Sequence, residues 1–559
     1  MAVERWAPIR QAASVNSSPL IDPSEILEKS AGLLQAGRCG DAATALRQAL
    51  DLAPANPAVT RAVARLSTLV RTWLTLGQLR PALDALAPLA ESPHADGTLL
   101  MLYGHALMSA GRKNEAEAVL RRWLAREPGN RDAALRLAAV LSDNGKATEA
   151  ETVIRTIVRG REDADVAFVL GRALLEQARF DEAEIQFRKV VRARPDHQIA
   201  HGNLMEIVWM RTGDVHEASR EIDKVLRASP DSPGLRVTKA RLLTSARLPK
   251  EALAEIDAGL RLAPSTPGLL AAAATIALDF DGTRALDYAS RLHATAPHDR
   301  TAQVAVGNAS LATGRAREAL VIAEALHDSD PTDGRALAMK ADALRMLGDP
   351  RYRGLLDYQH LVRAEPIDVP TGWTGLDAYL AELVADLERT HTLRAHPIGN
   401  SLREGSQIQL APQNSPFASI RAFPQAIDGP IRRYMQAIGT GSDPMRKRNT
   451  GRYDISGIWS VRLRPHGFHV NHYHPEGWIS SACYLHLPRA IEQAGGQGWL
   501  QFGEPAFPTN PLLEPEYFVK PSPGLLVLFP SYMWHGTVPF SGAPEDRRVT
   551  IAFDVVPLP

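Results

Sequence analysis

The chain has 559 residues, which is too long for one hydrophobic core, so two or more domains are expected. Its 63 basic and 63 acidic residues cancel, which argues against a general nucleic-acid or membrane-surface binder. No apolar run approaches the roughly 18 residues that span a bilayer, and the first residues lack the apolar core of a signal peptide. Only Cys39 and Cys483 occur, so disulfides are not expected. These features predict a cytoplasmic protein that binds neither nucleic acid nor membrane.

After an irregular or disordered stretch over residues 1–20, residues 21–350 repeat with a period near 34. An alanine recurs at steps of 33 to 35 residues, and a proline closes most of the units. This pattern resembles tetratricopeptide repeats (TPRs), helical hairpins that stack into a solenoid with a concave groove. The recurring alanines are Ala82, Ala116, Ala150, Ala183, Ala218, Ala252, Ala285 and Ala319.

The small alanine side chain lets paired helices approach closely, and proline cannot continue the helix before it. We expect nine or ten units and a groove that holds a protein or peptide partner, because solenoids commonly use their concave face in this way. A scaffold or dimerisation surface is the alternative. The sequence does not indicate the oligomeric state.

The alanine period stops after about residue 350. Residues 351–395 are expected to form a helical connector. Residues 396–559 contain short strand-like runs separated by glycine and proline, which is typical of a β-sandwich or barrel. The expected fold class is therefore a multidomain α+β chain, with an all-α solenoid followed by a β domain.

Three histidines of the last segment form the strongest candidate site. His472 and His474 lie two residues apart in GFHVNHYHP, and His535 follows in WHGT. Residues i and i+2 of a strand point the same way, so one strand can aim two imidazoles into a cavity while a distant strand supplies the third. An ion held in this way keeps open positions, which suits non-haem Fe(II) chemistry with O₂.

The runs WSVRL, GFHVNHYHP, GWISSACYLHLP, GLLVLFPSYMWHGT and RRVTIAFDV resemble the double-stranded β-helix, or jelly roll, of Fe(II)/2-oxoglutarate-dependent oxygenases. The chain is similar to uncharacterised bacterial members with N-terminal TPRs, and it also resembles aspartyl/asparaginyl β-hydroxylases. The resemblance implies a dioxygenase that uses Fe(II), 2-oxoglutarate and O₂ to hydroxylate a side chain of a protein or peptide substrate. The TPR groove would recruit that substrate.

The same resemblance implies roles for single residues. His472 would be the first iron ligand and His535 the distal one. Arg548 would bind the far carboxylate of 2-oxoglutarate, with Thr550 on the same strand face. Tyr484 occupies a place where related hydroxylases contact this cosubstrate.

The chain departs from the usual His-x-Asp motif, since it has His-x-His. We favour His474 as a third metal ligand. Two alternatives stay open, in which His474 stands behind a two-histidine site or Glu476 supplies a shifted carboxylate. A neutral imidazole in place of a carboxylate should weaken selectivity for Fe(II) over Zn, Ni or Cu. Arg547 is the fallback for Arg548.

Two neighbouring residues received weaker expectations. His469, three positions before His472, is expected to face away from the site. Arg462 on WSVRL is as well suited to reach the cavity as to avoid it.

Two other function classes remain. Paired histidines with a distant third also suit a cupin-like metal protein, which would not need Arg548 and Tyr484. A TPR adaptor with a degenerate, non-catalytic barrel would have no reason to hold stoichiometric iron.

Overall fold

The computed structural model describes residues 22–157, 160, 162–493 and 495–558. The expected irregular stretch over residues 1–20 lies outside this range. By compactness the chain divides into two units, Met1–Ala193 and Arg194–Pro559. The division falls inside the repeats, so the second half of the solenoid forms one unit with the C-terminal β region.

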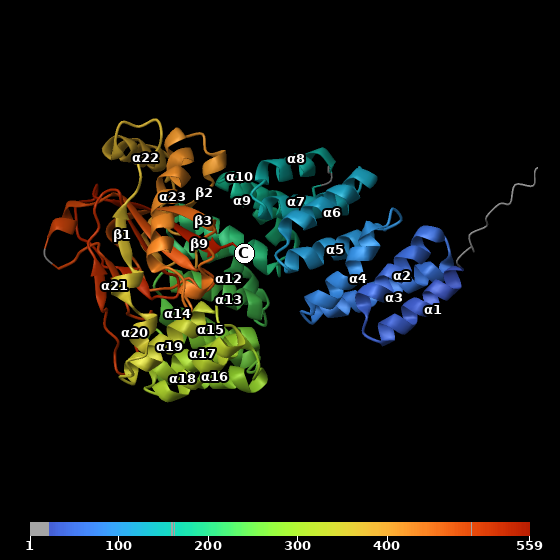
Figure 1. Cartoon of the computed structure of the whole chain (residues 1–559), viewed down its shortest axis with the longest axis horizontal. Helices are drawn as coiled ribbons and strands as arrows, with labels where there is room; N and C mark the ends of the chain where they lie inside the picture. The colour runs from blue at the N-terminus through green and yellow to red at the C-terminus, as the bar shows by residue number, and fades with distance from the viewer. Residues whose placement is uncertain (1–21, 158–159, 161, 494, 559) are drawn as a thin grey trace, which may run out of the picture. The chain divides into compact units, whose positions relative to one another are not determined.

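The helical repeats occupy α1 to α19 (Figure 1). In the first unit the helices are α1 (Pro23–Gln35), α2 (Cys39–Leu52), α3 (Pro57–Thr75), α4 (Leu79–Glu91), α5 (Gly97–Ser109), α6 (Lys113–Arg126), α7 (Arg131–Asp143), α8 (Ala147–Ile157), α9 (Ala164–Glu176) and α10 (Phe180–Ala193). In the second they are α11 (Gln198–Thr212), α12 (Val215–Ala228), α13 (Pro233–Ser245), α14 (Pro249–Leu262), α15 (Pro267–Ala277), α16 (Gly282–Thr295), α17 (Arg300–Ala312), α18 (Ala316–Ser329) and α19 (Gly334–Met346).

These helices form nine successive pairs followed by α19 within the described residues, as the alanine period predicts. Each recurring alanine lies on the second helix of its pair. All eight are buried, and seven of them are fully inaccessible to solvent. The alanines therefore mark the places where paired helices touch, because a larger side chain would hold the helices apart.

A residue with positive φ turns the chain inside most of the hairpins. Glycine fills this position in six described hairpins, at Gly37, Gly77, Gly111, Gly145, Gly213 and Gly314. Ala178 and Arg247 take the same position with φ of 56° and 63°. Side chains with a Cβ atom rarely adopt this conformation, so the two hairpins depart from the least strained choice.

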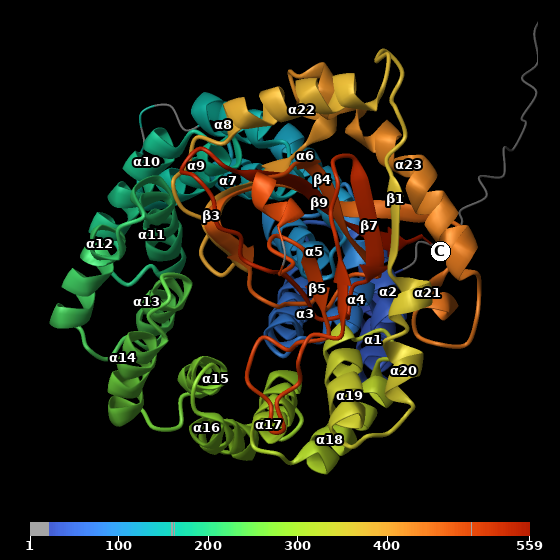
Figure 2. The same ribbon diagram turned by 90° about the vertical axis from the view of Figure 1, so that its left-hand side faces the viewer.

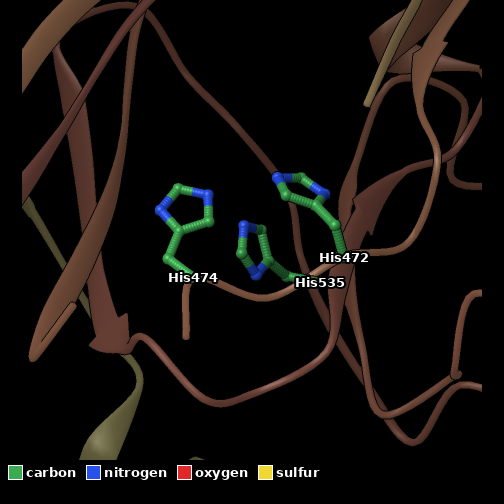
Figure 3. A group of neighbouring side chains, drawn as sticks. All are labelled: His472, His474 and His535. Carbon is green, nitrogen blue, oxygen red and sulfur yellow. The ribbon is translucent and has the colours of Figure 1, made fainter. Parts of the chain in front are cut away.

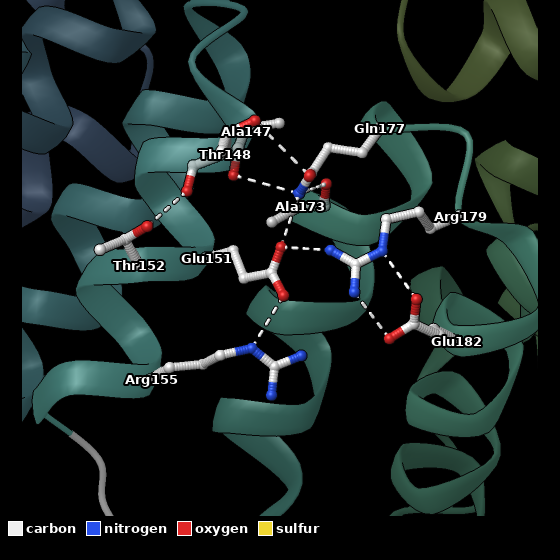
Figure 4. A network of polar contacts seen from close by, with 9 residues as sticks. All are labelled: Ala147, Thr148, Glu151, Thr152, Arg155, Ala173, Gln177, Arg179 and Glu182. Atoms are coloured by element: carbon white, nitrogen blue, oxygen red, sulfur yellow. Dashed lines mark hydrogen bonds and ion pairs between the residues drawn. The ribbon is translucent and has the colours of Figure 1, made fainter.

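Charged side chains link neighbouring repeats of the first unit (Figure 4). Glu151 on α8 accepts hydrogen bonds from Arg155 Nε at 2.8 Å, Arg179 Nη1 at 2.5 Å and Gln177 Nε2 at 3.0 Å. Burial alone would raise the pKa of Glu151, but the bonds from Gln177 and Arg155 and the charge of Arg179 lower it. The Glu151 carboxylate thus ties the second helix of one hairpin to the turn of the next.

The C-terminal region adds α20 (Tyr352–Leu355), α21 (Tyr358–Leu361), α22 (Leu376–Thr390) and α23 (Ala418–Ile438) to an antiparallel sheet region. A six-stranded sheet has the order β1-β7-β4-β9-β3-β2, and a three-stranded sheet has the order β6-β5-β8. The strands are β1 (Arg363–Pro366), β2 (Leu402–Leu410), β3 (Tyr453–His469), β4 (Ile479–His486), β5 (Leu500–Phe502), β6 (Tyr517–Val519), β7 (Leu525–Pro530), β8 (His535–Thr537) and β9 (Arg548–Pro557).

The segment expected to be a helical connector, residues 351–395, also contributes a strand. Here β1 pairs with β7 at the edge of the larger sheet, with Arg363 opposite Leu528. The run Arg363–Pro366 has neither alternating hydrophobicity nor β-branched side chains, so the sequence pattern gives no sign of it.

One face of the larger sheet packs against α22 and α23. Val549, Ile551, Phe553 and Val555 of β9 are buried in the same apolar cluster as Leu383 and other residues of the two helices. Successive side chains of a strand point to opposite faces. The intervening residues of β9, from Arg548 to Asp554, therefore face the other side of the sheet.

Within the second unit, α11 to α19 follow an arc, and the strands lie on its inner side (Figure 2). Several contacts join the two. Trp209 Nε1 on α11 donates to the His396 carbonyl at 2.9 Å, and Asn510 N donates to the Leu311 carbonyl at 3.1 Å. Part of the concave face expected to hold a partner is thus covered by the chain's own C-terminal region.

We predict that Glu151→Ala loosens α8 to α10 by about 1–2 kcal/mol, because Arg155 and Gln177 lose a charged acceptor. Native-state hydrogen exchange on the full chain measures this as faster exchange in these helices. The pKa of Glu151 is lowered on folding, so its contribution is complete at neutral pH. It disappears as the pH falls from the unfolded value, about 4.5, through the lower folded value.

Glu318→Ala is the matched control, because its exposed carboxylate lies 3.8 Å from its partner Arg315. It should leave exchange in α17 and α18 within a few tenths of a kcal/mol of the original. Equal effects of the two substitutions would contradict a specific role for Glu151.

Candidate metal site

The polypeptide backbone brings the first and last of the three histidines together. His472 follows β3, and His535 begins β8. The two residues form an isolated antiparallel bridge, in which each N–H donates to the other's carbonyl at 2.9 Å. The N–H of His474 donates to the Ser531 carbonyl at 2.8 Å, which fixes the same segment two residues further on.

The three imidazoles face a common space (Figure 3). One potential ligand atom from each of His472, His474 and His535 lies within 4.8 Å of the other two. The ring centroids of His472 and His535 are 4.2 Å apart, and His474 lies 5.2 and 5.3 Å from them. This group could hold a metal ion.

Each imidazole is oriented through its Nδ1 atom. The Nδ1 of His472 lies 2.8 Å from the Val470 carbonyl, and that of His535 lies 3.0 Å from the Met533 carbonyl. These acceptors require an N–H at Nδ1, which leaves the lone pair on Nε2. A backbone carbonyl behind the ring is the usual partner of a metal-binding histidine.

His474 has a charged partner instead. Its Nδ1 lies 2.7 Å from both carboxylate oxygens of Asp554 on β9. Ser480 Oγ donates to the same carboxylate at 2.8 Å. The third imidazole is thus backed by a negative charge one hydrogen bond away.

Burial keeps two of the rings uncharged. It lowers the pKa of His472 to about 3, with a further contribution from the nearby His474. Burial also lowers the pKa of His535 well below its usual value, and His472 and His474 add to this. Neutral imidazole is the form that binds metal, so protons do not compete for these nitrogens near neutral pH.

Arg548 lies in the same cavity with its guanidinium only partly satisfied. The residue is 2% exposed, and its Nε has no hydrogen-bond partner among the residues that the structure describes. Its guanidinium carbon lies 4.9 Å from the ring centroid of Tyr484, which is opposite Thr550 in the register of β4 and β9. Burial lowers the pKa of Arg548, and Tyr484 opposes this effect.

The cavity that these groups share has a volume of about 610 Å³. Its walls include the three histidines, Arg548, Thr550 and Asp554, together with Trp459 and Val461 of β3. Tyr484 does not line the cavity itself but lies behind Arg548. Its buried hydroxyl also lacks a hydrogen-bond partner among the described residues.

The last solenoid helix holds the segment that carries His535. Trp534 Nε1 donates to Asp342 of α19 at 2.8 Å, and burial raises the pKa of this carboxyl to about 7. On the same helix, Arg345 Nη1 donates to the Gly503 carbonyl at 2.6 Å. The repeats therefore help to position the site, in addition to any partner that they bind.

The structure distinguishes several of the sequence candidates. Arg547 points away from the cavity to an ion pair with Glu388, whereas Arg548 points into it. The exposed Glu476 lies at the cavity wall, but its carboxylate pairs with Arg335 at 2.6 Å. Arg462 alternates with the lining residues of β3 and is absent from the cavity wall.

The expectation that His469 faces away from the site is wrong. It lines the same cavity, with its ring centroid 5.8 Å from that of His472. Ser401 Oγ lies between them, 2.9 Å from Nδ1 of His469 and 3.3 Å from Nε2 of His472. The argument from alternation fails because β3 ends at His469, so the three residues up to His472 do not continue the strand.

Sequence reasoning assigned no role to Asp554 or Ser401. Asp554 lies six residues after Arg548 on one strand, and this even separation places both on the same face. That signal was available. Ser401 is about 70 residues from the histidines and has no motif around it, so no sequence pattern indicates it.

Comparisons with known proteins agree with this division of the chain. Residues 457–554, which include the three histidines, Arg548 and Asp554, match a family model described as "Putative 2OG-Fe(II) oxygenase". Residues 107–167 and 164–197 match tetratricopeptide-repeat models. No curated protein matches the chain. The chain therefore carries TPRs and a C-terminal region similar to this oxygenase family.

Similar solved structures are TPR proteins with TM-scores below 0.5. One from Parabacteroides merdae is 17% identical, covers 45% of this chain and 98% of its own, and has a TM-score of 0.33. A thermophilic TPR protein of Thermus thermophilus is 21% identical over 34% of this chain and 99% of its own, with a TM-score of 0.24. MamA of Desulfovibrio magneticus is 24% identical over 30% and 95%, with a TM-score of 0.26.

One further feature concerns the membrane. Among the described residues, no helix combines the length and the apolar character needed to cross a bilayer.

We predict that Asp554→Ala weakens divalent metal binding by about 10- to 100-fold, because His474 loses the partner that orients its ring. Competition with a chromophoric chelator, on metal-free protein, measures this affinity. Glu476→Ala is the control, since it removes a carboxylate at the cavity wall that does not contact a histidine. An unchanged affinity in Asp554→Ala would show that His474 does not bind the metal.

Proposed function

We propose that the protein is an Fe(II)- and 2-oxoglutarate-dependent dioxygenase that hydroxylates a side chain of a protein or peptide substrate recruited by the TPR solenoid. The observation that carries this proposal is the position of Arg548. A buried guanidinium with an unpaired Nε shares one cavity with three clustered imidazoles.

The donor set fits a divalent transition metal. His472, His474 and His535 offer imidazole nitrogens from two chain segments, and three protein ligands leave positions open for other ligands. Imidazole alone does not select Fe(II) over Zn, Ni or Cu. The carboxylate of Asp554 behind His474 supplies the negative charge that a directly bound Asp would otherwise give.

The remaining charges favour a dianionic cosubstrate. With neutral imidazoles, the cations and anions deep in the cavity are Arg548 and Asp554, which cancel. A bound divalent metal leaves two uncompensated positive charges, and two carboxylates restore neutrality. Uncompensated charge is costly in a buried site, so metal and dicarboxylate should bind together.

Arg548 is suited to hold the carboxylate that lies away from the metal. Guanidinium binds carboxylate through charge-assisted hydrogen bonds, which are stronger than neutral ones. Packing against Tyr484 fixes the guanidinium plane before the ligand arrives, and Thr550 lines the cavity two residues further along the strand. The chain thus pays little conformational entropy on binding.

With iron bound, the site would couple oxidative decarboxylation of 2-oxoglutarate by O₂, to succinate and CO₂, with insertion of the second oxygen atom into a substrate C–H bond. The protein's part is to orient the reactants and to exclude side reactions. The three rings are held by acceptors at Nδ1, and Trp459 and Val461 supply apolar wall that limits access of water.

A cupin-like metal protein is the second candidate, because three imidazoles without a directly placed carboxylate also suit such a barrel. The two candidates differ at Arg548, which the cupin-like protein does not need. Metal-dependent binding of 2-oxoglutarate separates them.

We predict that Arg548→Ala weakens 2-oxoglutarate binding by about 10- to 100-fold, the worth of a hydrogen bond to a charged group. Its metal affinity should remain unchanged. Arg547→Ala is the matched control, because the adjacent side chain pairs with Glu388 on the other side of the strand. Anaerobic calorimetry in the presence of Mn²⁺ gives both affinities. Loss of metal binding in Arg548→Ala would contradict the role given to this residue.

A turnover assay tests the proposed activity directly. Anaerobic protein is loaded with Fe(II) and 2-oxoglutarate, then exposed to O₂ with cell extract, and succinate and oxygen-atom mass gains are measured. His472→Ala and His535→Ala should each abolish succinate formation, because an imidazole on each chain segment is needed to hold the ion. Circular dichroism checks that the helices remain. Succinate formation in either variant would refute the ligand assignment.

A further inference from the structure

A second cavity of the same unit is lined by four arginines. It has a volume of about 470 Å³ and lies along the segment that leads into β2. The arginines come from four separate places in the sequence, namely Arg247 after α13, Arg394 before β2, Arg403 on β2 and Arg464 on β3.

Positive charge exceeds negative charge in this cavity. Glu404 is the acidic residue of its wall, and its carboxylate lies 3.7 Å from Arg464. Asp279 acts on Arg403 from the end of α15. Burial lowers the pKa of Arg403, and the charge of Arg247 lowers it further, which is the expected effect of cations gathered without enough anions.

The guanidinium groups are held in place by backbone carbonyls. Arg464 Nη1 donates to the Arg394 carbonyl at 2.8 Å. Arg403 Nη1 donates to the carbonyls of Asn400 and Leu402 at 2.6 and 2.7 Å. Each guanidinium has five N–H donors, so both keep donors for a ligand.

An imidazole of the cavity wall is also unsatisfied. His396 is 5% exposed, and its Nε2 has no hydrogen-bond partner among the described residues. Burial and the charge of Arg403 keep the pKa of this ring low, at about 4. A buried polar atom without a partner is costly, and an anionic ligand could accept a hydrogen bond from a neutral ring at this atom.

The backbone is strained at two residues of this wall. Arg247 has φ of 63° in the turn where most hairpins carry glycine, and Glu404 has φ of 51°. Four residues other than glycine have positive φ in the described chain, and two of them line this cavity. Such strain is retained where the surrounding structure uses the side chain, because glycine would take the position at lower cost.

An apolar groove connects this cavity with the histidine cluster. The groove has a volume of about 400 Å³, and its walls include Val237 and Ala240 of α13 and Ala271 and Ile276 of α15. It shares Ser245 and Arg403 with the arginine cavity, and Gly399 and Asn400 with the metal cavity. The three hollows are therefore continuous.

The segment from Arg394 to Ser401 sets the length of this path. Arg394 lines the arginine cavity, and Ser401 contacts His472. Seven residues of extended chain span at most roughly 25 Å. An extended peptide lying alongside would cover the path with about seven residues.

We propose that the arginine cavity anchors an acidic side chain of the protein substrate, whose chain then follows the apolar groove to the histidine cluster. The inference rests on the proposed function and specifies its substrate as a peptide with Asp or Glu within about seven residues of the modified position. Arginine forks match carboxylates, and the apolar walls of the groove suit a peptide chain better than a small anion.

Fluorescence anisotropy on the full-length, metal-free protein tests this anchor without turnover. The probe is a fluorescein-labelled peptide of alternating glutamate and serine, about twelve residues long so that it exceeds the path. A lysine–serine peptide of equal length reverses the charge. We expect the acidic peptide to bind with an affinity that falls with added salt, and the basic peptide not to bind.

Arg247→Gly with Arg394→Gln removes two cations of the cavity, and we expect at least tenfold weaker binding of the acidic peptide. Glycine restores the residue that most other hairpins have, so thermal unfolding of Arg247→Gly alone should occur at the same or a higher temperature. Arg261→Gln, at the exposed end of α14 outside the cavity, is the matched control and should change the affinity less than twofold.

Three results would overturn the proposal, namely no binding by the original chain, equal binding by the double variant, or displacement of the peptide by inorganic phosphate at a comparable concentration. The last would indicate a site for small anions. Arginine-dependent binding without succinate formation would refute the proposed oxygenase and leave the peptide anchor. Succinate formation coupled to a substrate whose binding ignores Arg247 and Arg394 would refute the anchor alone.

Discussion

The alternation of side chains along β9 determines the contents of the metal cavity. Val549, Ile551, Phe553 and Val555 are buried against α22 and α23, so every second residue between them must face the opposite side. Arg548, Thr550 and Asp554 are those residues. A slip of one residue would expose the apolar set and remove the guanidinium and carboxylate from the cavity together. Packing of the helices thus fixes the register on which the chemistry depends.

Charge balance links the metal to its cosubstrate. Arg548 and Asp554 cancel one another, which leaves the empty cavity neutral when its imidazoles are neutral. A divalent cation or a dicarboxylate alone would disturb this balance, whereas the two together would preserve it. The same reasoning explains how His-x-His can replace His-x-Asp, since Asp554 places a carboxylate directly behind His474.

The solenoid has two roles in this account. Through Asp342 and Arg345, α19 holds loops of the site, among them the residue before His535. Through α13 and α15, it forms one wall of the path from the arginine cavity to the metal site. Scaffold and substrate groove, which the sequence presents as alternatives, can therefore be combined in one arc of helices.

Local periodicity explains how much of this the sequence predicts. The alanine period indicates the hairpins because each alanine marks a close helix crossing, and the spacing of His472 and His474 indicates a shared face. Features that depend on distant segments are different. No sequence pattern connects Ser401 with His472, or Arg247 with Arg464, because tertiary packing alone brings them together. The strand β1 was missed for the same reason, since its pairing with β7 overrides a weak local preference.

The most direct test of the account is anaerobic calorimetry of 2-oxoglutarate binding to the unaltered chain, with and without Fe(II). Charge balance predicts one molecule of 2-oxoglutarate per chain in the presence of Fe(II) and much weaker binding in its absence. If Fe(II) binds but 2-oxoglutarate affinity is the same with and without it, the link between the histidine cluster and Arg548 is contradicted.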